Sequence, residues 1–212
     1  MELLTRIAEQ LQAGEDEAVH HLVRQALDAG FAPGDVLNKG LLAGMDVVGE
    51  QFRVREIFLP DVLLAARAMY AGLEVLQPLL ARDGVPTAGT VVIGSVKGDV
   101  HDIGKNLVGI MLKGAGFAVV DLGNDVPPER FVEAAEESGA QVIGMSALLT
   151  TTMAGMRQVV ELVERRGLSP RVKTIVGGAP VTEAFAREIG ADAYAFDAAS
   201  AVERVRALVG AR

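Results

Sequence analysis

The spacing of apolar residues changes once along this chain, soon after residue 82. Before that point apolar residues recur every three or four positions, as in Leu3, Ile7 and Leu11, which is the stripe of an amphipathic helix. Beyond it they fall into short β-rich runs separated by helical stretches. A chain with these two periods is expected to fold in two parts, a helical part followed by an α/β part.

The helical part is expected to be a four-helix bundle over residues 1–84. Gly14 and Gly30 end the first two helices, and Pro33 opens a third. A fourth helix starts near Leu59. Because the turns between these helices are short, the helices should pack against one another as a bundle.

A linker is expected between the two parts. Residues 82–89 combine Gly, Pro and small side chains without any periodicity, which is typical of a connecting segment. We assign residues 85–89 to the linker itself and expect it to act as a hinge.

Residues 90–212 alternate strands and helices. The expected strands are 90–95, 118–122, 141–146, 172–176 and 192–196. The expected helices are 103–114, 128–138, 152–166, 181–189 and 199–209. Five such units predict a flavodoxin-like or Rossmann-like five-stranded parallel sheet with helices on both faces. Ligands of such sheets bind beyond the carboxyl ends of the strands, so the residues that follow each strand are the candidates for a site.

Composition excludes several classes of function. The 212 residues include no Cys, which excludes disulfides, thiolate metal sites and iron–sulfur clusters. A formal charge of −8 without a basic tract argues against a nucleic-acid partner. Apolar runs such as 142–149 are far shorter than the roughly 18 residues of a membrane span, and the first residues lack a secretion signal. We therefore expect a cytoplasmic protein without a membrane partner, whose metal, if any, enters through His, carboxylate or a carried cofactor.

The loop after the first strand, residues 94–106, holds three glycines and a charged cluster. Its glycines match neither of the common phosphate-binding motifs. What remains is His101 between Asp99 and Asp102. A carboxylate that holds one ring nitrogen of a His fixes its tautomer and raises its basicity, which suits a metal ligand or a base. The alternative is a solvated polar loop in which Asp102 is the N-cap of the next helix.

Two further strand ends add small and polar residues to the same edge. Ser146 and the hydroxyl run Thr150–Thr152 follow the third strand, and the pair Gly177-Gly178 follows the fourth. Two residues without Cβ let a bulky group approach the backbone. Taken singly, the Thr run also fits a helix cap, and the glycine pair also fits an ordinary left-handed turn. Together with the His101 loop they indicate a wide, deep slot and not a compact catalytic pocket.

Taken in order, these strand-end residues resemble a known family. The motifs Asp99-x-His101-x-x-Gly104, Ser146-x-Leu148 and Gly177-Gly178 are similar to those of the corrinoid-binding domain shared by methionine synthase and the methyltransferase corrinoid proteins. The segments Val47–Phe52 and Phe58–Val62 resemble the helical cap that precedes that domain. The resemblance covers nearly the whole chain, and it implies cobalamin or a related corrinoid as cofactor, in its cob(I)alamin and methylcob(III)alamin forms.

The resemblance also implies roles for individual residues. His101 ligates the cobalt from the lower face, Asp99 holds the other ring nitrogen, and Thr152 stands where methionine synthase has the serine of a His–Asp–Ser relay. These three are the catalytic candidates. The implied cofactor-binding residues also include Gly98, Val100, Asp102, Ile103, Gly104, Ser146, Leu148, Thr150, Gly177 and Gly178, of which Gly104 relieves the loop. In the cap, Phe52, Leu59 and Val62 cover the upper face, although any bundle core would use the same residues.

On this resemblance the chain is a methyl carrier of one-carbon metabolism, non-catalytic alone. Cobalt(I) takes a methyl group from a donor on a substrate-specific methyltransferase, and methyl-Co(III) passes it to a second methyltransferase whose acceptor is tetrahydrofolate or a thiol such as coenzyme M. A reductive activase is a further expected partner. The donor stays open among methanol, methylamines, betaines and methoxylated aromatics, as do the lower base of the corrinoid and the oligomeric state.

Three alternatives stay open at this point. A cobalamin-dependent sensor or regulator needs a DNA-binding module and a basic surface. Part of an adenosylcobalamin mutase shares the His loop but needs a barrel domain. A flavodoxin-like or receiver-type regulator leaves the glycine pair unexplained.

Overall fold

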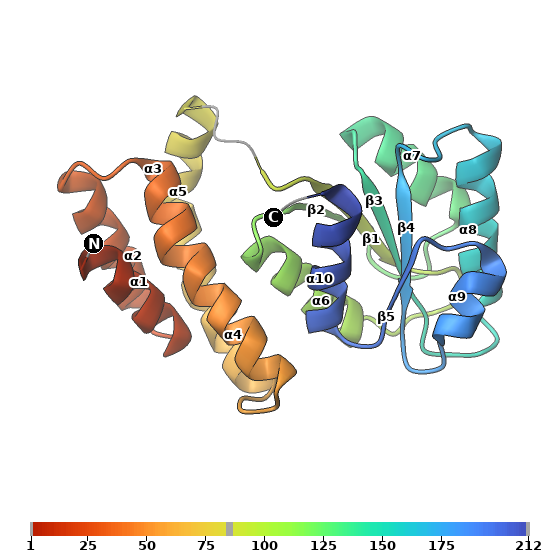
Figure 1. The fold of residues 1–212 in the computed structure, drawn as a ribbon, viewed down its shortest axis with the longest axis horizontal. Coiled ribbons are helices and arrows are strands. Elements are labelled where there is room, and N and C mark those ends of the chain that lie inside the picture. The colour runs from red at the N-terminus through yellow and green to blue at the C-terminus, as the bar shows by residue number, and fades with distance from the viewer. Residues whose placement is uncertain (1, 84–86, 211–212) are drawn as a thin grey trace. The chain divides into compact units, whose positions relative to one another are not determined.

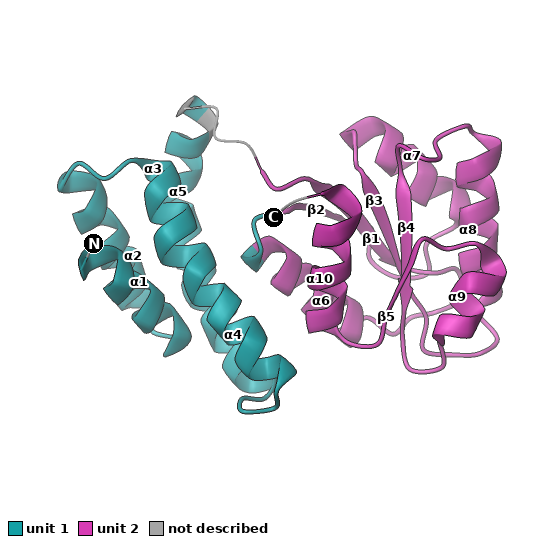
Figure 2. Cartoon of the chain, viewed as in Figure 1, with its two compact units in different colours: residues 1–86, 114–116 teal, residues 87–113, 117–212 magenta. Residues whose placement is uncertain are grey.

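The computed structural model describes residues 2–83 and 87–210. The chain forms two compact units, residues 1–86 with 114–116 and residues 87–113 with 117–212, which Figure 2 draws in different colours. Residues 85 and 86 of the predicted linker lie outside the described residues. The first unit is helical, and the second contains the sheet.

Glycines end the first two helices of the first unit. They are α1 (Glu2–Gln12), α2 (Asp16–Asp28), α3 (Pro33–Val36), the π-helical segment η1 (Leu37–Leu42), α4 (Ala43–Arg53) and α5 (Leu59–Asp83). Gly14 and Gly30 follow α1 and α2 with φ of 75° and 85°. This left-handed conformation is the one in which a glycine commonly terminates a helix, so the predicted stop signals are confirmed.

The predicted third helix is a continuous element in which α3, η1 and α4 follow one another without a break. Its middle part is π-helical, a local widening that apolar spacing does not reveal. This element lies close against α1: a Cβ on Gly40 would lie 3.1 Å from Cγ2 of Ile7, and one on Gly44 would lie 3.0 Å from the carbonyl oxygen of Ala8. Residues without side chains therefore permit the close packing of these two helices.

The sheet of the second unit has the strand order β2-β1-β3-β4-β5, and every neighbouring pair is parallel. The strands are β1 (Thr90–Ser95), β2 (Ala118–Asp121), β3 (Val142–Ser146), β4 (Lys173–Gly177) and β5 (Ala193–Ala195). The helices are α6 (Ile103–Gly114), α7 (Pro128–Ser138), α8 (Ala154–Arg165), α9 (Glu183–Ile189) and α10 (Ala198–Val209). The predicted α/β class is confirmed, and the bounds in this unit differ from the prediction by at most two residues.

Helices cover both faces of the sheet, α6 and α10 on one face and α7, α8 and α9 on the other (Figure 1). Neighbouring residues of β1 point to opposite layers: a Cβ on Gly94 would lie 2.8 Å from the ring of Phe131 in α7, whereas Ile93 lies against Gly109 of α6. After β1 the chain adds β2 on one side and then places β3 on the other side. The crevice beyond the carboxyl ends of β1 and β3 is therefore the usual ligand position of this topology.

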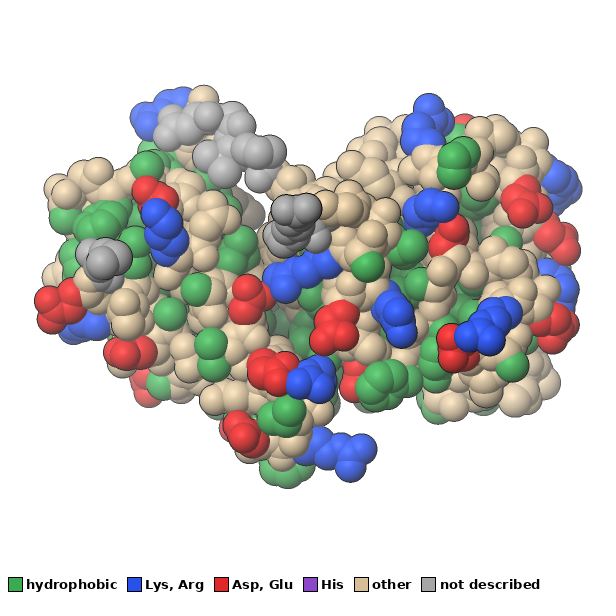
Figure 3. Space-filling view, in the orientation of Figure 1, with side chains coloured by type: hydrophobic (Ala, Val, Ile, Leu, Met, Phe, Trp, Pro, Cys, Tyr) green, Lys and Arg blue, Asp and Glu red, His purple; other side chains and the backbone are tan. Residues whose placement is uncertain are grey.

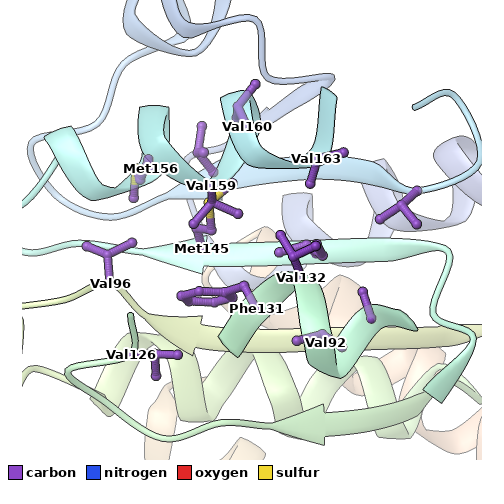
Figure 4. Close-up of a cluster of buried hydrophobic side chains, with 14 of the residues drawn as sticks. Val92, Val96, Val126, Phe131, Val132, Met145, Met156, Val159, Val160 and Val163 are labelled. Atoms are coloured by element: carbon purple, nitrogen blue, oxygen red, sulfur yellow. The ribbon is translucent and has the colours of Figure 1, made fainter. Parts of the chain in front are cut away.

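The core between the sheet and helices α7 to α9 is one cluster of buried apolar side chains (Figure 4). Phe131 comes from α7 and Val159 from α8, and they pack with Val92 of β1 and Met145 of β3. Phe131 is the largest of the completely buried side chains. Aliphatic residues supply most of the remaining volume, as expected for a chain with 4 % aromatic residues.

Acidic and basic side chains are interspersed on the face of the molecule that Figure 3 shows. Some of these charges pair four residues apart, as Lys39 does with Asp35 and Arg187 with Glu183. Exposed pairs of this kind contribute at most about 1 kcal/mol each, so the fold depends on its apolar cores. Among the helices of the described ranges, none combines the length and the apolarity needed to cross a membrane.

Replacing Phe131 with Ala should lower the free energy of unfolding by about 3–5 kcal/mol, because the change leaves a cavity between α7 and the sheet. Phe196→Ala is the matched control, since that side chain is 71 % exposed and its loss should change stability by no more than about 0.5 kcal/mol. Urea denaturation followed by circular dichroism measures both variants. Equal losses in the two variants would contradict this description of the core.

Candidate functional site

Two loops leave the sheet side by side at the carboxyl ends of β1 and β3. The two strands pair in register as far as Ser95 and Ser146. The first loop, residues 96–102, leads into α6, and the second, residues 147–153, leads into α8. The two loops therefore meet at the point where the strand order reverses.

Asp99, in the first loop, is the centre of the site. Its side chain is completely buried. Oδ1 accepts hydrogen bonds from the ring Nδ1 and the backbone N–H of His101, at 2.8 and 3.1 Å. Oδ2 accepts from the hydroxyl of Thr152 at 2.7 Å and from the backbone N–H groups of Leu148 and Leu149 at 2.7 and 3.2 Å. One carboxylate thus joins the two loops.

The donors around Asp99 determine its charge. Burial by itself raises the pKa of a carboxyl group, because it penalises the charged form. Here the hydrogen bonds from Thr152, Leu148 and His101 outweigh burial and hold the pKa of Asp99 well below its usual range. Asp99 is therefore a carboxylate at neutral pH, and it can only accept hydrogen bonds.

His101 takes its orientation and its tautomer from Asp99. Because the carboxylate only accepts, the proton of a neutral imidazole lies on Nδ1, and Nε2 keeps its lone pair. The His101 side chain is 45 % exposed, so a ligand can reach the ring from solvent. His101 therefore offers one nitrogen of defined tautomer to a metal ion or to a proton.

Thr152 completes the hydrogen-bonded chain with its hydroxyl, which also lies 2.8 Å from the carbonyl oxygen of Leu149. Its methyl group lies near Gly98, where a Cβ would be 3.5 Å from Cγ2 of Thr152. The methyl group thus fills space beside a residue without a side chain, and the hydroxyl keeps its place on Asp99. The structure therefore brings the three catalytic candidates, Asp99, His101 and Thr152, into direct contact.

Exposed apolar side chains occur in the same two loops and at the start of α6. Val100, Ile103 and Leu148 are 66 %, 75 % and 45 % exposed. Thr150 is also exposed, and Asp102 is half-buried. Large apolar side chains that a protein leaves exposed together mark a binding surface. The surroundings of His101 therefore suit a large ligand with apolar faces.

Gly104 does not relieve a loop, and that expectation is wrong. It lies in the first turn of α6, and it is not one of the glycines with a positive φ. A Cβ at this position would meet nothing within 4 Å. A glycine inside a helix is about 1 kcal/mol less favourable than Ala, and neither backbone conformation nor packing within the chain requires one here. The space beside Gly104 is open to solvent.

Gly177 and Gly178 are required by packing within the chain itself. A Cβ on Gly177 would lie 2.8 Å from the carbonyl oxygen of Ala195, and one on Gly178 would lie 1.9 Å from that of Ala147. The φ of Gly178 is 131°, which also excludes most side chains. Ser146, half-buried, pairs with Gly177 across β3 and β4. We predicted that these two glycines let a bulky ligand approach the backbone. In the structure, neighbouring strand and loop backbone approaches them in this way.

The three predicted cap residues lie in the first unit. Phe52 belongs to α4, and Leu59 and Val62 belong to α5. Phe52 and Leu59 are half-buried, whereas Val62 is completely buried. Val62 therefore behaves as a core residue, and Phe52 and Leu59 keep part of their apolar surface exposed.

Lys105 is a residue of the site region that the motifs do not single out. Its side chain is 3 % exposed, and its ammonium group donates to both carboxylate oxygens of Asp121 at 2.7 Å. It also donates to the side-chain oxygen of Asn106 at 2.6 Å. These bonds join the first turn of α6, which follows His101, to the end of β2. In the sequence, the burial of Lys105 is indicated only by its spacing of four residues from Gly109, which places both residues on one face of the helix.

The chemistry of the donor set fits one class of metal centre. His101 presents a single nitrogen, so the site suits a metal whose other ligands come with it, as in a macrocycle. The exposed apolar loops and the open space at Gly104 suit the faces of such a group. The residues present therefore fit a corrinoid whose cobalt receives one axial nitrogen.

Comparison with known proteins agrees with this fit. Two family models, each described as a B12 binding domain, match residues 89–206 and residues 3–77. Trimethylamine corrinoid protein 1 of Methanosarcina acetivorans is 45 % identical over 98 % of this chain and 97 % of its own length. Dimethylamine corrinoid protein 2 of Methanosarcina mazei is 45 % identical with the same two coverages. In the crystal structure of the methanol:cobalamin methyltransferase complex from Methanosarcina barkeri, the matching chain has a TM-score of 0.89 at 34 % identity, over 100 % of this chain and 81 % of that chain.

Acid unfolding should report the carboxylate of Asp99. Its pKa is lower in the folded protein than in the unfolded chain, where it is about 3.9. The contribution of this group to the free energy of unfolding is therefore complete above about pH 5 and is lost as the pH falls below that value. The difference in unfolding free energy between the parent and Asp99→Asn should shrink by up to about 1.4 kcal/mol per pH unit in the acid range, as measured by urea denaturation.

Two neighbouring threonines provide the controls for this measurement. Thr152→Val removes one donor from Asp99, so its difference from the parent should shrink in the same direction but by less. Thr151→Val changes an exposed residue and should follow the parent at every pH. A difference between the parent and Asp99→Asn that does not vary with pH would contradict the ionised state of Asp99.

Proposed function

Because this chain belongs to the methyltransferase corrinoid proteins, a B12-binding family, we propose that it carries a methyl group on a bound corrinoid between two partner enzymes. The observation that supports this role most directly is the Asp99–His101 pair, which leaves Nε2 as the single nitrogen available to the cobalt. The bound cofactor supplies the cobalt that accepts and releases the methyl group. The protein itself holds, orients and protects that cofactor.

Asp99 determines that Nε2 is the nitrogen of His101 that keeps a lone pair. When Nε2 ligates the cobalt, it cannot hold a proton, and when the ligand bond is broken, Nε2 is free to accept one. The carboxylate of Asp99 holds the ring through Nδ1 at 2.8 Å, so Nε2 is the ring atom left for either partner. The hydroxyl of Thr152 and the two backbone donors keep Asp99 ionised throughout. Cobalt binding and proton binding at Nε2 would therefore exclude each other, because both use the same lone pair.

The remaining predicted residues line the cofactor in this proposal. Val100, Ile103 and Leu148 offer apolar contact beside the imidazole, and their exposure supports that role. The other members of this lining are Gly98, Asp102, Gly104, Ser146, Thr150, Gly177 and Gly178. Phe52 and Leu59 of the first unit would shield the corrinoid, a role that rests on the resemblance of their segments to the family's cap. Val62, the third residue of the predicted cap, is completely buried and belongs to the core of that unit.

The partners follow from what the relatives are called. Two relatives are named for trimethylamine and dimethylamine, and the matching solved structure is a methanol:cobalamin methyltransferase complex. We therefore propose a methylamine-type or methanol-type methyltransferase as the partner that loads the methyl group. A second methyltransferase, with tetrahydrofolate or a thiol such as coenzyme M as acceptor, removes it, and a reductive activase restores the reduced cobalt.

The axial ligand is tested with His101→Ala. The full chain is labelled with nitrogen-15, so that splitting by a protein nitrogen differs from splitting by the nitrogen-14 of the cofactor's own base. It is then loaded with hydroxocobalamin and reduced to Co(II), and the electron paramagnetic resonance spectrum is recorded. We expect the parent to show splitting from one axial nitrogen, and His101→Ala to keep the corrinoid without that splitting. The other two histidines, His20 and His21, lie on α2, so His21→Ala is the matched control and should resemble the parent. Persistent splitting in His101→Ala would show that another nitrogen is the ligand.

The carrier role is tested by methyl loading under anaerobic conditions. The reduced, corrinoid-loaded chain is mixed with trimethylamine, dimethylamine or methanol, each with and without a purified methyltransferase specific for that donor. The visible spectrum should change to that of the methylated cofactor only when a donor and its methyltransferase are both present, because the chain itself has no donor site in this proposal. A corrinoid that binds stoichiometrically but is loaded by none of these pairs would count against the carrier role.

A further inference from the structure

The loop that presents His101 is held along its backbone by two residues outside the predicted site, Ser95 and Asp125. The hydroxyl of Ser95 donates to the carbonyl oxygen of His101 at 2.7 Å. A carboxylate oxygen of Asp125 accepts from the backbone N–H of Gly98 at 2.7 Å, and the backbone N–H of Asp125 donates to the carbonyl oxygen of Asp99 at 2.9 Å. The segment 98–101 is thereby held at both of its ends.

Ser95 holds the loop from the sheet. It is the last residue of β1, and its side chain is completely buried. Its own backbone is anchored at both polar groups, since its N–H donates to the carbonyl oxygen of Gly123 and its carbonyl oxygen accepts from the N–H of Val126, each at 3.0 Å. Water does not compete for a buried hydroxyl, which strengthens its bond to His101. Ser95 therefore fixes the backbone of His101 relative to the end of β1.

Asp125 holds the loop from the turn between β2 and α7. Its φ is 53°, a left-handed conformation that residues other than glycine adopt rarely and that Asp tolerates better than most. Such a conformation persists where several contacts enforce it, and Asp125 has its two contacts with Gly98 and Asp99. The neighbouring Asn124 adds a third bond from the same turn, from its side-chain amide to the carbonyl oxygen of Val100 at 3.2 Å.

We propose that Ser95 and Asp125 are positioning residues that direct Nε2 of His101 toward the cobalt, an inference that rests on the proposed function. The bonds of both residues described above go to backbone atoms of the loop and not to the imidazole ring. They act on the backbone on either side of the Asp99 carboxylate, so the loss of either lets the ring turn away from Asp99 and lets the proton move from Nδ1 to Nε2. In the parent protein, β1, the β2–α7 turn and Asp99 together set the direction in which Nε2 of His101 points.

The first experiment needs no cofactor. In the full chain labelled with nitrogen-15, long-range proton–nitrogen correlation spectra report which ring nitrogen of His101 carries the proton. The parent should show the Nδ1–H form. Ser95→Ala and Asp125→Gly should each lower the ratio of this form to the others about fivefold, which is the effect of losing one ordinary hydrogen bond. Asp125→Asn keeps an acceptor oxygen for Gly98 and should stay close to the parent.

The second experiment uses the chain loaded with hydroxocobalamin and reduced to Co(II). The ratio of nitrogen-split to unsplit signal in the electron paramagnetic resonance spectrum should fall about fivefold in Ser95→Ala and in Asp125→Gly. Thr174→Val is the matched control. It also removes a buried hydroxyl, one that donates to Asp192 at 3.2 Å near the amino-terminal end of β4. This control should lose stability and keep both spectra of the parent.

The outcomes separate this inference from the proposed function. Parent-like spectra of both kinds in Ser95→Ala and Asp125→Gly would overturn the positioning role. The same spectral changes in Thr174→Val would also overturn it, because a general loss of stability would then explain them. A parent without nitrogen splitting would overturn the ligand assignment of the proposed function, and the tautomer spectra alone would then decide the role of Ser95 and Asp125.

Discussion

The buried carboxylate of Asp99 is the interaction on which the rest of the site depends. Removing a charge from water is unfavourable by several kcal/mol unless other groups solvate it, and here the donors come from His101, Thr152 and the backbone of the second loop. Without the second loop, the charge of Asp99 in the first loop would lose most of its donors. Without Asp99, the donors of the second loop would lack this acceptor, so the loops after β1 and β3 hold each other in place. The tautomer of His101 follows from this arrangement, because the oxygen facing its ring can only accept a hydrogen bond.

A protein that contributes one nitrogen and an apolar surface leaves the reactivity to its cofactor. In the proposed role the choice of methyl donor would rest with the partner enzyme. Relatives named for trimethylamine and for dimethylamine are equally similar to this chain, at 45 % identity over the same share of its length. Overall sequence similarity therefore does not distinguish between these two groups of relatives.

Sequence patterns predicted what depends on neighbouring residues, and they failed where distant segments meet. The bounds of β1, α6 and α7 agree with the prediction because glycine, proline and changes of period mark their ends. The bond of Asp125 to Gly98 was not predictable, because it depends on how the segment after β2 lies against the end of β1. The bond of Ser95 to His101 was not predictable either, because it depends on how the loop after β1 folds back toward the strand. Gly104 is instructive in another way. A glycine can serve an unusual backbone conformation or a close contact, and only the structure shows that neither applies within the chain at Gly104.

The bond between Asp99 and Thr152 joins residues 53 positions apart, and this separation has a consequence for the order of folding. The loop between them must close before the bond forms, and parallel pairing of β1 with β3 must bring the two strand ends together first. Until then Asp99 stays hydrated and His101 samples both tautomers. In a chain emerging during synthesis, the tautomer of His101 is therefore undefined until β3 has docked on β1.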